Sequence, residues 1–333
     1  MKHVLTFILL VVLAATFSCG TNEPEKVKFM AGFKAQANLP FAAVYVAQEK
    51  GYFDEQGLNV EILHSGGGGE NLTLLLANKV DFTTADANTV LKHRASQDIP
   101  IVAFALFGQR GQQAFVSLAE SGINAPADWE GKRFGYKISI PPDYLAIIDV
   151  SGVDRAKIEE IQVGFDPRIL IEEKVDVLAV FKSNEPDTIR TLGHDVNVFE
   201  AADLGLPTLG LTYVGTEETI SKKSETTERF LRSTLRAVEF IRTNREESLD
   251  IIMKYADKEN RNHMKFMLET ELSDAITPQT IEKGIGWMTT DQWDSLQQHL
   301  LKFGALDGEV SISDAIHTNF LEEIYNEGKV RWP

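Results

Sequence analysis

The chain has 333 residues, of which 43% are hydrophobic and 25% are charged, and this length and composition are typical of a globular protein with about two domains. Its formal net charge of −16 argues against nucleic-acid binding, because phosphates require compensating lysines and arginines and no basic run offsets the acidity. The single cysteine, Cys19, excludes an intramolecular disulfide, and the seven histidines show neither HxxH nor HExxH spacing, so we expect no metal site and no cofactor.

The first 18 residues have the pattern of an export signal. Lys2 and His3 precede an uncharged run, Val4 to Phe17, which is shorter than the ~20 residues that a helix needs to span a bilayer. A basic start, an apolar stretch and an end with small residues are typical of a secretory signal. We therefore expect a signal peptide over 1–18.

The residues around Cys19 resemble the lipobox of bacterial lipoproteins, in which the cysteine becomes the lipidated N-terminus. Cys19 is followed by Gly20, whereas Thr16 and Phe17 depart from the usual pattern. We expect a lipidated tether over 19–26, and the alternative is plain cleavage that leaves a free terminal thiol.

The residues that follow alternate predicted strands with predicted helices. The expected elements are a strand over 27–33, a helix over 41–50, a strand over 59–63, a helix over 70–78, and strands over 80–84 and 99–107. Pro40 fits the first turn of the first helix. The second strand ends in Gly66–Gly69, and the third runs into Asp86. Because ligands bind outside the carboxyl ends of strands in an open α/β sheet, these two strand ends predict a ligand site at a common edge.

The run over 99–107 is apolar almost throughout, which is typical of a strand buried on both faces of a parallel sheet. A second α/β unit follows it. Its expected elements are strands over 115–118, 133–136, 159–163, 175–181 and 196–199, with a helix over about 144–150.

The chain returns in an apolar strand over 209–214, and everything after that strand is expected to be helical. The expected helices cover 226–243, 246–255, 260–270, 289–302 and 312–325. In the first of them, apolar residues follow a period of 3.6: Phe230, Leu231, Leu235, Val238, Phe240 and Ile241. This tail contains no predicted βαβ unit, so we expect it to pack on the first unit.

Two crossings between the units, near Gly108 and near Pro207, predict a two-segment hinge. We therefore expect an α/β fold with two lobes and the ligand between them. Lobe one would comprise 27–108 plus 208–333, including the helical C-terminal extension, and lobe two would comprise 109–207.

A long stretch of the chain carries a family resemblance. The residues YVAQEKGYFDEQGLNVEIL, the GGGG turn and LLLANKVDFTTADANTVLKHRASQDIPIVAFALF are similar to bacterial ABC-transporter substrate-binding proteins of the nitrate/sulfonate/taurine and thiamine-pyrimidine-precursor group. The resemblance covers most of the chain from about Val27 to about Tyr325. It implies a type 2 periplasmic-binding-protein clamp that hands a small molecule to a membrane permease.

The motif AVF-x-x-NEP over 179–186 resembles the branch of this group that carries vitamin-type heterocycles, including the thiamine pyrimidine and riboflavin. In those relatives an acidic residue after the lobe-two strand contacts the heterocycle, and Glu185 occupies the matching position. A related fungal pyrimidine synthase uses a cysteine-rich CCCFC-type segment, which a chain with only Cys19 does not contain.

Three residues near the first loop are candidate ligand contacts. Phe33, Asn38 and Phe41 combine an amide with aromatic rings at the expected cleft edge, which suits a flat ligand. Their ordinary structural roles would be a helix cap for Asn38 and core packing for the two phenylalanines.

The glycine turn and the third strand end supply further candidates. Backbone N–H groups of Gly67 and Gly68 precede a helix and could hold an anion or a carbonyl, although no GK[ST] follows and the turn is not a P-loop. Asp86 and Asn88 could bind a ligand through short polar side chains, or could cap the helix that begins near Asn88.

The first crossing and lobe two complete the candidate set. Gln109 lies at the crossing, and Tyr136 and Tyr144 flank the lobe-two loop, where their rings could stack on a ligand or anchor the loop. Asn184 and Glu185 precede Pro186, and the Glu185 carboxylate could accept charge-assisted hydrogen bonds from a heterocycle or could be a solvated loop acid.

No nucleophile, metal site or acid–base pair is evident, so the leading hypothesis is a non-enzymatic, monomeric lipoprotein on the outer face of a cell membrane. It would capture riboflavin or a thiamine pyrimidine precursor for an ABC permease. One alternative keeps the fold but binds nitrate, a sulfonate or taurine, since a helix N-terminus can hold an anion even in an acidic chain. Others are a pyrimidine-biosynthesis enzyme and a tethered sensor domain.

Overall fold

The computed structural model describes residues 23–97 and 99–333 of the chain. The predicted signal over 1–18, Cys19 and the first residues of the predicted tether therefore lie outside the described residues. Among the described residues, no helix has both the length and the apolar character that a bilayer crossing requires.

The first of two five-stranded sheets has the strand order β2-β1-β3-β10-β4. Its strands are β1 (Glu25–Ala31), β2 (Leu58–His64), β3 (Phe82–Asp86), β4 (Ile101–Leu106) and β10 (Leu211–Thr216). Strand β1 is parallel to β2 and β3, whereas β10 is antiparallel to β3 and β4. This sheet therefore combines four strands from the start of the chain with one that returns much later.

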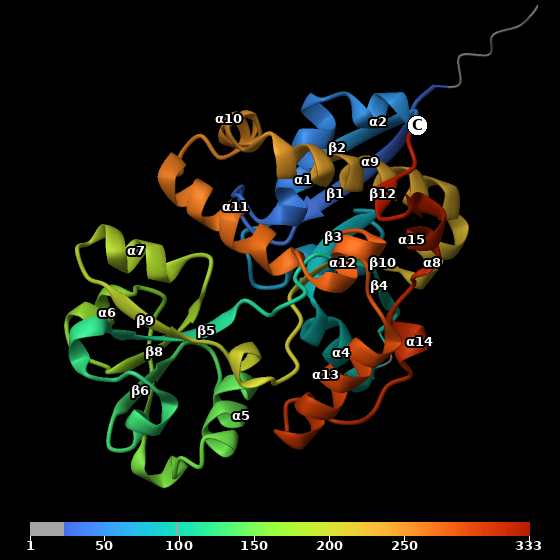
Figure 1. Cartoon of the computed structure of the whole chain (residues 1–333). Helices are drawn as coiled ribbons and strands as arrows, with labels where there is room; N and C mark the ends of the chain where they lie inside the picture. Colours follow the sequence, from blue (N-terminus) through green and yellow to red (C-terminus); the bar gives the residue numbers. More distant parts are fainter. Residues whose placement is uncertain (1–22, 98) are drawn as a thin grey trace, which may run out of the picture.

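The second five-stranded sheet has the order β7-β6-β8-β5-β9. Its strands are β5 (Gln113–Leu118), β6 (Arg133–Tyr136), β7 (Glu159–Gln162), β8 (Val177–Phe181) and β9 (Val196–Phe199). Strand β6 is parallel to β7 and β8, whereas β5 is antiparallel to β8 and β9. The two sheets lie in separate bodies (Figure 1), which we call lobe one and lobe two in chain order. The predicted two-lobed α/β architecture is confirmed.

Helices cover both sheets. Those of lobe one are α1 (Leu39–Glu49), α2 (Tyr52–Glu55), α3 (Glu70–Leu76), α4 (Ala87–Gln97), α8 (Glu217–Lys222), α9 (Ser224–Thr243), α10 (Arg245–Tyr255), α11 (Arg261–Ala275), α12 (Pro278–Lys283), α13 (Thr290–Lys302), α14 (Ile312–Ala315) and α15 (Asn319–Ile324). Those of lobe two are α5 (Pro142–Val150), α6 (Arg168–Ile171) and α7 (Glu185–Thr191), with short 3₁₀ turns over Ala119–Ser121, Pro126–Trp129, Arg155–Lys157 and Ala201–Leu204.

The core of lobe one forms around the long helix α9. The ring of Phe230 lies 4.9 to 5.8 Å from the rings of Phe29, Phe53, Phe82 and Tyr213, distances at which aromatic pairs add to the free energy of burial. The predicted apolar stripe of this helix is confirmed, because its residues from Phe230 to Ile241 that carry the 3.6 period are buried or pack against the core. The tail is therefore held on lobe one by apolar packing.

Lobe two has a smaller core of stacked aromatic rings. Phe134 and Tyr144 stack with ring centroids 3.9 Å apart and planes only 2° from parallel. Trp129 stacks beside both, and Phe115 packs against the same group. This core fixes β6 against α5.

The position of β4 differs from the prediction. We expected a strand inside a parallel sheet, but β4 lies at the edge of the first sheet with the antiparallel β10 as its one neighbouring strand there. It is nevertheless fully buried, because the tail covers its free edge. The backbone N–H of His317 donates to Ala103 at 2.8 Å, and the N–H of Leu106 donates to Gly286 at 2.8 Å. An apolar run alone cannot distinguish this covered edge from a parallel interior.

The tail also differs from the all-helical prediction. The helix expected over 312–325 is divided into α14 and α15, because Ile316 is extended and pairs with the edge of β4. After α15, the chain forms a two-stranded hairpin from β11 (Tyr325–Asn326) and β12 (Lys329–Val330). Long-range pairing therefore overrides the helical pattern in this region.

The two connections between the lobes lie side by side. The chain leaves the first sheet after Leu106 and returns to it at Leu211. Gly210 N–H donates to the carbonyl of Gly108 at 2.7 Å, and a Cβ atom on Gly108 would lie 2.7 Å from Gly210 Cα. The two backbones can approach this closely because both residues are glycine.

The carboxyl ends of the parallel strands in both lobes face the hinge. In lobe one, Leu211 at the second connection pairs with Asp86, the last residue of β3. In lobe two, Gln113 at the first connection pairs with Phe181, the last residue of β8. The two sheet edges at which ligands bind in open α/β folds therefore face each other across the hinge.

Candidate functional site

Helix α11 of lobe one brings carboxylates to the edge that faces lobe two. Asp274 accepts hydrogen bonds from Lys182 Nζ of lobe two and from Nε2 of Gln112, each at 2.8 Å. The Lys182 ammonium also donates to Glu200 at 2.7 Å. The two contacts of Asp274 join α11 to the end of β8 and to the hinge, so they exist only when the lobes are close together, whereas the Lys182–Glu200 contact lies within lobe two.

One turn earlier on α11, Glu271 lies against the start of α1. Its carboxylate accepts the backbone N–H of Leu39 at 2.7 Å and the side-chain amide of Asn38. The hydroxyl of Ser183 from lobe two lies 3.5 Å from the same carboxylate. Asn38 therefore orients an acid instead of capping its own helix.

Three carboxylates gather at this edge with little compensating charge. Burial, together with the neighbouring charges of Asp274 and Asp86, raises the pKa of Glu271 to about 8, although the hydrogen bonds from Leu39 and Asn38 oppose this shift. Burial also raises the pKa of Asp86 and that of Asp274 to about 6 each, and for Asp274 the Lys182 ammonium opposes this shift. Among the described residues, no group of acids and histidines is arranged to hold a metal ion.

The facing wall of lobe two contains a buried ion pair. Glu185, the first residue of α7, is only 5% exposed, and it accepts the backbone N–H of Phe181 at 2.9 Å. Lys137, which follows β6, forms an ion pair with the Glu185 carboxylate. The Lys137 ammonium lies 5.3 Å from the ring centroid of Phe181 and 5.6 Å from that of Phe165, within the range of cation–π attraction.

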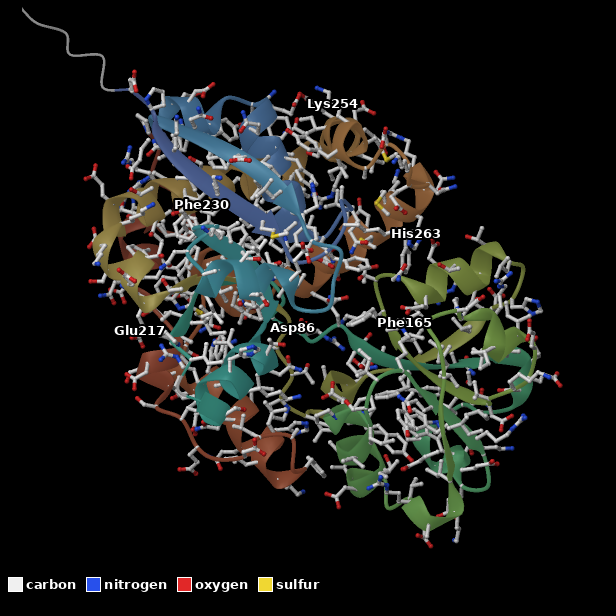
Figure 2. All side chains as sticks on the ribbon, turned by 180° about the vertical axis from the view of Figure 1, so that it is seen from behind. Asp86, Phe165, Glu217, Phe230, Lys254 and His263 are labelled. Atoms are coloured by element: carbon white, nitrogen blue, oxygen red, sulfur yellow. The ribbon has the colours of Figure 1, made fainter. Side chains whose placement is uncertain are left out.

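Aromatic rings remain exposed on the same faces. Phe165 is 66% exposed and Phe181 is 46% exposed on lobe two, and Phe33 is 43% exposed on the loop that follows β1 in lobe one. Figure 2 shows Phe165 and Asp86 on the facing edges of the two lobes. Exposed rings around a polar centre suit a flat ligand, because stacking buries apolar area on both faces of such a molecule.

Polar contacts bridge the lobes on both sides of this region. On one side, His263 of α11 lies 2.7 Å from an Asp187 oxygen and 2.9 Å from the side-chain oxygen of Asn184 on lobe two. On the other side, Lys302 of α13 donates to Asp149 of α5 at 2.7 Å. Figure 1 shows α11 beside α7 in this arrangement. The two lobes are therefore in contact on both sides of the cleft, and the cleft between them is closed.

A small void remains next to the hinge, too narrow for a ligand in this closed arrangement. It is lined by Leu39, Phe107, Gly108, Gln112, Leu211 and Glu271. The Gln112 side-chain oxygen is buried and has no hydrogen-bond partner among the described residues. Its amide nitrogen is fixed by Asp274, so the oxygen is left as an unsatisfied acceptor.

The structure brings most of the predicted residues to the facing edges. Asn38, Asp86, Asn184 and Glu185 lie there with the contacts described above. Phe33 lies beside the glycine turn, since a Cβ atom on Gly67 would be 3.2 Å from its ring. The other predicted residues at strand ends are Gly68 in that turn, Asn88 in the first turn of α4 and Tyr136 at the end of β6.

Three predicted residues lie elsewhere. Phe41 is 2% exposed in the core of lobe one and Tyr144 is fully buried in the core of lobe two, so their rings serve packing and do not line the cleft. The Gln109 amide donates to the carbonyls of Leu106 and Trp287 within lobe one, so it fixes the hinge. The rings of Phe41 and Tyr144 therefore have packing roles, and the Gln109 amide has a structural role at the hinge.

Several residues at the facing edges were not predicted from the sequence. They are Lys137, Phe165, Phe181, Lys182, His263, Glu271 and Asp274. Lys182 directly follows a predicted strand, and this position is the signal in the sequence that points to it. The acids of α11 lie in a helix with many charged residues, and nothing in that local pattern distinguishes them.

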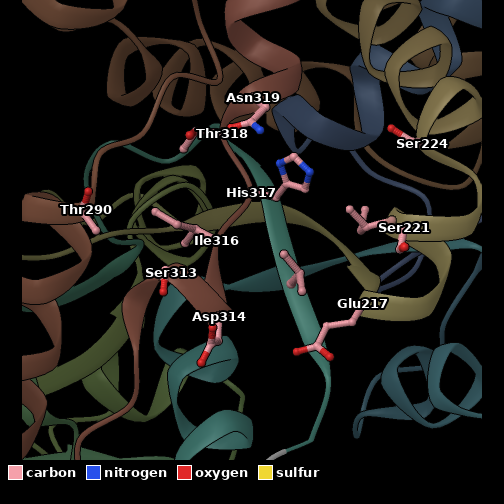
Figure 3. Close-up of a pocket in the computed structure, with 12 residues that line it drawn as sticks. Glu217, Ser221, Ser224, Thr290, Ser313, Asp314, Ile316, His317, Thr318 and Asn319 are labelled. Atoms are coloured by element: carbon pink, nitrogen blue, oxygen red, sulfur yellow. The ribbon is translucent and has the colours of Figure 1, made fainter.

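A larger hollow lies on another part of lobe one (Figure 3). It has a volume of about 670 Å³, and its lining includes Val102, Glu217 and His317. Val102 is near the start of β4, whereas the cleft lies beyond the other end of that strand at Leu106. The hollow contains none of the predicted site residues, so we do not assign it to the site between the lobes.

Comparison with known proteins agrees with the resemblance drawn from the motifs. A family model described as NMT1/THI5 like matches residues 38–248. The formylaminopyrimidine-binding protein of Halalkalibacterium halodurans is 25% identical over 95% of this chain and 98% of its own length. The riboflavin-binding protein RibY of Chloroflexus aurantiacus is 25% identical over 85% of this chain and 83% of its own length. Two fungal relatives are named as pyrimidine phosphate synthases and match smaller shares of the chain.

Among solved structures, the periplasmic aliphatic sulphonate binding protein SsuA of Escherichia coli is similar, with a TM-score of 0.68 and 14% identity over 89% of this chain and 92% of that one. At this level of identity the likeness concerns the fold alone. The chain therefore belongs to the NMT1/THI5-like family and has the periplasmic-binding-protein fold.

Proposed function

We propose that this protein is an extracytoplasmic substrate-binding lipoprotein of an ABC importer. It captures a vitamin-type heterocycle, an aminopyrimidine or riboflavin, between its two lobes and performs no chemistry on it. It acts as a monomer, and its partners are the small-molecule ligand and a membrane permease, not a nucleic acid.

The observation that carries this proposal is the composition of the two facing edges. Exposed rings from both lobes, Phe33, Phe165 and Phe181, surround a polar centre that includes the buried Glu185–Lys137 pair. Rings that stack on a planar ligand, together with a few fixed polar groups that orient it, are the usual features of a heterocycle site. The names of two relatives, a formylaminopyrimidine-binding and a riboflavin-binding protein, support the same ligand class.

A sulfonate or nitrate is the alternative ligand. We consider it because the fold is similar to that of a sulphonate-binding protein. Such an anion needs available cations or N–H donors in the cleft. The two lysines there, Lys137 and Lys182, are already paired with Glu185 and Asp274. These pairs favour a heterocycle over a small anion.

Pyrimidine synthesis is the enzymatic alternative, because two relatives carry that name. The single cysteine, Cys19, cannot supply the cysteine-rich segment of the related fungal synthase. A product formed by the purified protein alone would favour this alternative.

The lipid anchor is proposed from the sequence around Cys19, which lies outside the described residues. Labelling of cells with a palmitate analogue tests it. We expect label on the wild-type protein and none on Cys19→Ala, and equal labelling of the two would contradict the anchor.

A thermal-shift screen tests the ligand class. We expect an aminopyrimidine or riboflavin to raise the melting temperature, because a ligand present at 100 times its Kd stabilises the native state by about 2.7 kcal/mol. Taurine, methanesulfonate and nitrate should leave the melting temperature unchanged. A shift with these anions and none with the heterocycles would replace the proposed ligand with a sulfonate or nitrate, and no shift with any compound would contradict the proposal.

A further inference from the structure

The side chains around the small void beside the hinge present hydrogen-bond acceptors to it and few donors. Gln112 directs an unpartnered side-chain oxygen to the buried region beside the hinge, and Glu271 lines the same void. Asp86 lies at the same edge, because it pairs with Leu211, which also lines the void. Among the described residues, none donates a hydrogen bond to the Asp86 carboxylate.

The charges around this void have a negative excess. The carboxylates are Asp86 on β3, Glu271 and Asp274 on α11, and Glu200 at the end of β9. Two cations face them: Lys182 contacts Asp274 and Glu200, and Arg110 of the hinge contacts Glu200 and Asp203. Asp86 and Glu271 thus have no cationic partner among the described residues, whereas the Glu185 carboxylate across the cleft is paired with Lys137.

We propose that the cleft binds its heterocycle as a cation, through an amino or amidine group that donates hydrogen bonds to the Gln112 oxygen and to the carboxylates of Asp86 and Glu271. This inference rests on the proposed function and selects within it. An aminopyrimidine that gains a proton on its ring nitrogen meets the requirement. Riboflavin does not meet it, because riboflavin is neutral. Nitrate and a simple alkanesulfonate do not meet it either, because these anions only accept hydrogen bonds.

The raised pKa values of Asp86 and Glu271 agree with this assignment. In the closed site without a ligand, burial favours the protonated carboxyl group of Asp86, and burial together with the neighbouring acids favours that of Glu271. A cationic ligand would stabilise their ionised forms, and the carboxylates would in turn stabilise the protonated ring. The proton balance is complete, because the ring nitrogen receives its proton from a carboxyl group or from solvent.

Ultraviolet absorption of a bound pyrimidine tests this inference directly. The probe is 4-amino-2,5-dimethylpyrimidine, whose spectrum changes when the ring is protonated. We expect the bound probe to titrate at least about one pH unit above the free probe, which corresponds to 1.36 kcal/mol. Its analogue 2,4,5-trimethylpyrimidine has nearly the same shape but no amino donor, and it should bind at least about tenfold more weakly, the effect of 1.4 kcal/mol.

Asp86→Asn should weaken binding of the amino probe by about tenfold or more and return its titration toward that of the free probe. The variant should fold and melt at or above the wild-type temperature, because it removes a partly buried charge without a partner. Asp54→Asn is the matched control, since Asp54 is exposed on α2. It should change neither the affinity nor the titration.

The possible outcomes separate this inference from the proposed function. Equal binding of the two pyrimidines, an unshifted titration or an unchanged Asp86→Asn variant would overturn the inference and leave the heterocycle-binding function standing. Tight binding of riboflavin without binding of the pyrimidine would do the same. Failure of every heterocycle to bind would overturn the proposed function itself.

Discussion

Gly108→Ala is expected to lower the free energy of unfolding by about 1–3 kcal/mol, the cost of inserting an atom into a well-packed region. The new Cβ would lie 2.7 Å from Gly210 Cα and 2.8 Å from the backbone nitrogen of Leu211. Both neighbours are backbone atoms, so the two connections must move apart. Their separation would also lengthen the hydrogen bond from Gly210 N–H to the Gly108 carbonyl and disturb the hinge.

Chemical denaturation and ligand titration measure this effect. Gly308→Ala is the control, because Gly308 has open space around its Cβ position and no positive φ. The control should keep wild-type stability and affinity, whereas Gly108→Ala should have a lower free energy of unfolding and a weaker affinity for the ligand. Wild-type behaviour of Gly108→Ala would contradict the structural role that we assign to the close approach of the two connections.

Glu185→Gln is expected to weaken ligand binding by about 1.5–3 kcal/mol, the range for a hydrogen bond to a charged group. It should also destabilise lobe two, because the Lys137 side chain is only 11% exposed and would lose its charged partner. Removal of one member of a buried ion pair costs about 3–5 kcal/mol when the other charge remains buried, and an amide that still accepts a hydrogen bond should cost less.

A double variant separates stability from binding. Lys137→Met combined with Glu185→Leu removes both charges, so it should recover most of the stability, since apolar replacements of buried pairs are often neutral. It should not recover ligand affinity, as measured by calorimetry. Wild-type affinity in the double variant would show that the pair has a purely structural role and would remove Glu185 from the site.

The sequence predicted the strand ends better than the contacts between lobes. Asp86 could be found because it follows a predicted strand, where open sheets bind ligands, and Glu185 because it matches an acidic residue after the lobe-two strand in the family that the sequence resembles. Glu271 and Asp274 could not, because α11 reaches the same edge from the distant tail. No local pattern identifies which charges of a surface helix will face another lobe.

The sequence also could not show which aromatic residues line the cleft. Phe41 and Tyr144 looked as suitable for stacking as Phe33, but tertiary packing buries them in the two cores. Phe165 and Phe181, which remain exposed, gave no stronger signal in the sequence. Whether a ring is buried or exposed depends on the tertiary packing of its lobe. The spacing of apolar residues along the chain does not determine that packing.

The edge position of β4 has a similar cause. Strand β10 inserts antiparallel between β3 and β4, and the segment around Ile316 covers the remaining edge. Both pairings join residues that are far apart in the chain. An apolar run predicts that such a strand is buried, but not which segments bury it.

Small-angle X-ray scattering with and without the ligand chosen by the thermal screen tests the central claim, that two lobes close over a cargo molecule. We expect the free protein to open, because opening returns the buried carboxylates of Asp86, Glu271 and Asp274 to water. The contacts of His263 and Lys182 across the lobes are lost on opening. Saturating ligand should reduce the radius of gyration to that of the closed structure. An unchanged radius of gyration at a ligand concentration shown by calorimetry to saturate the protein would contradict the claim.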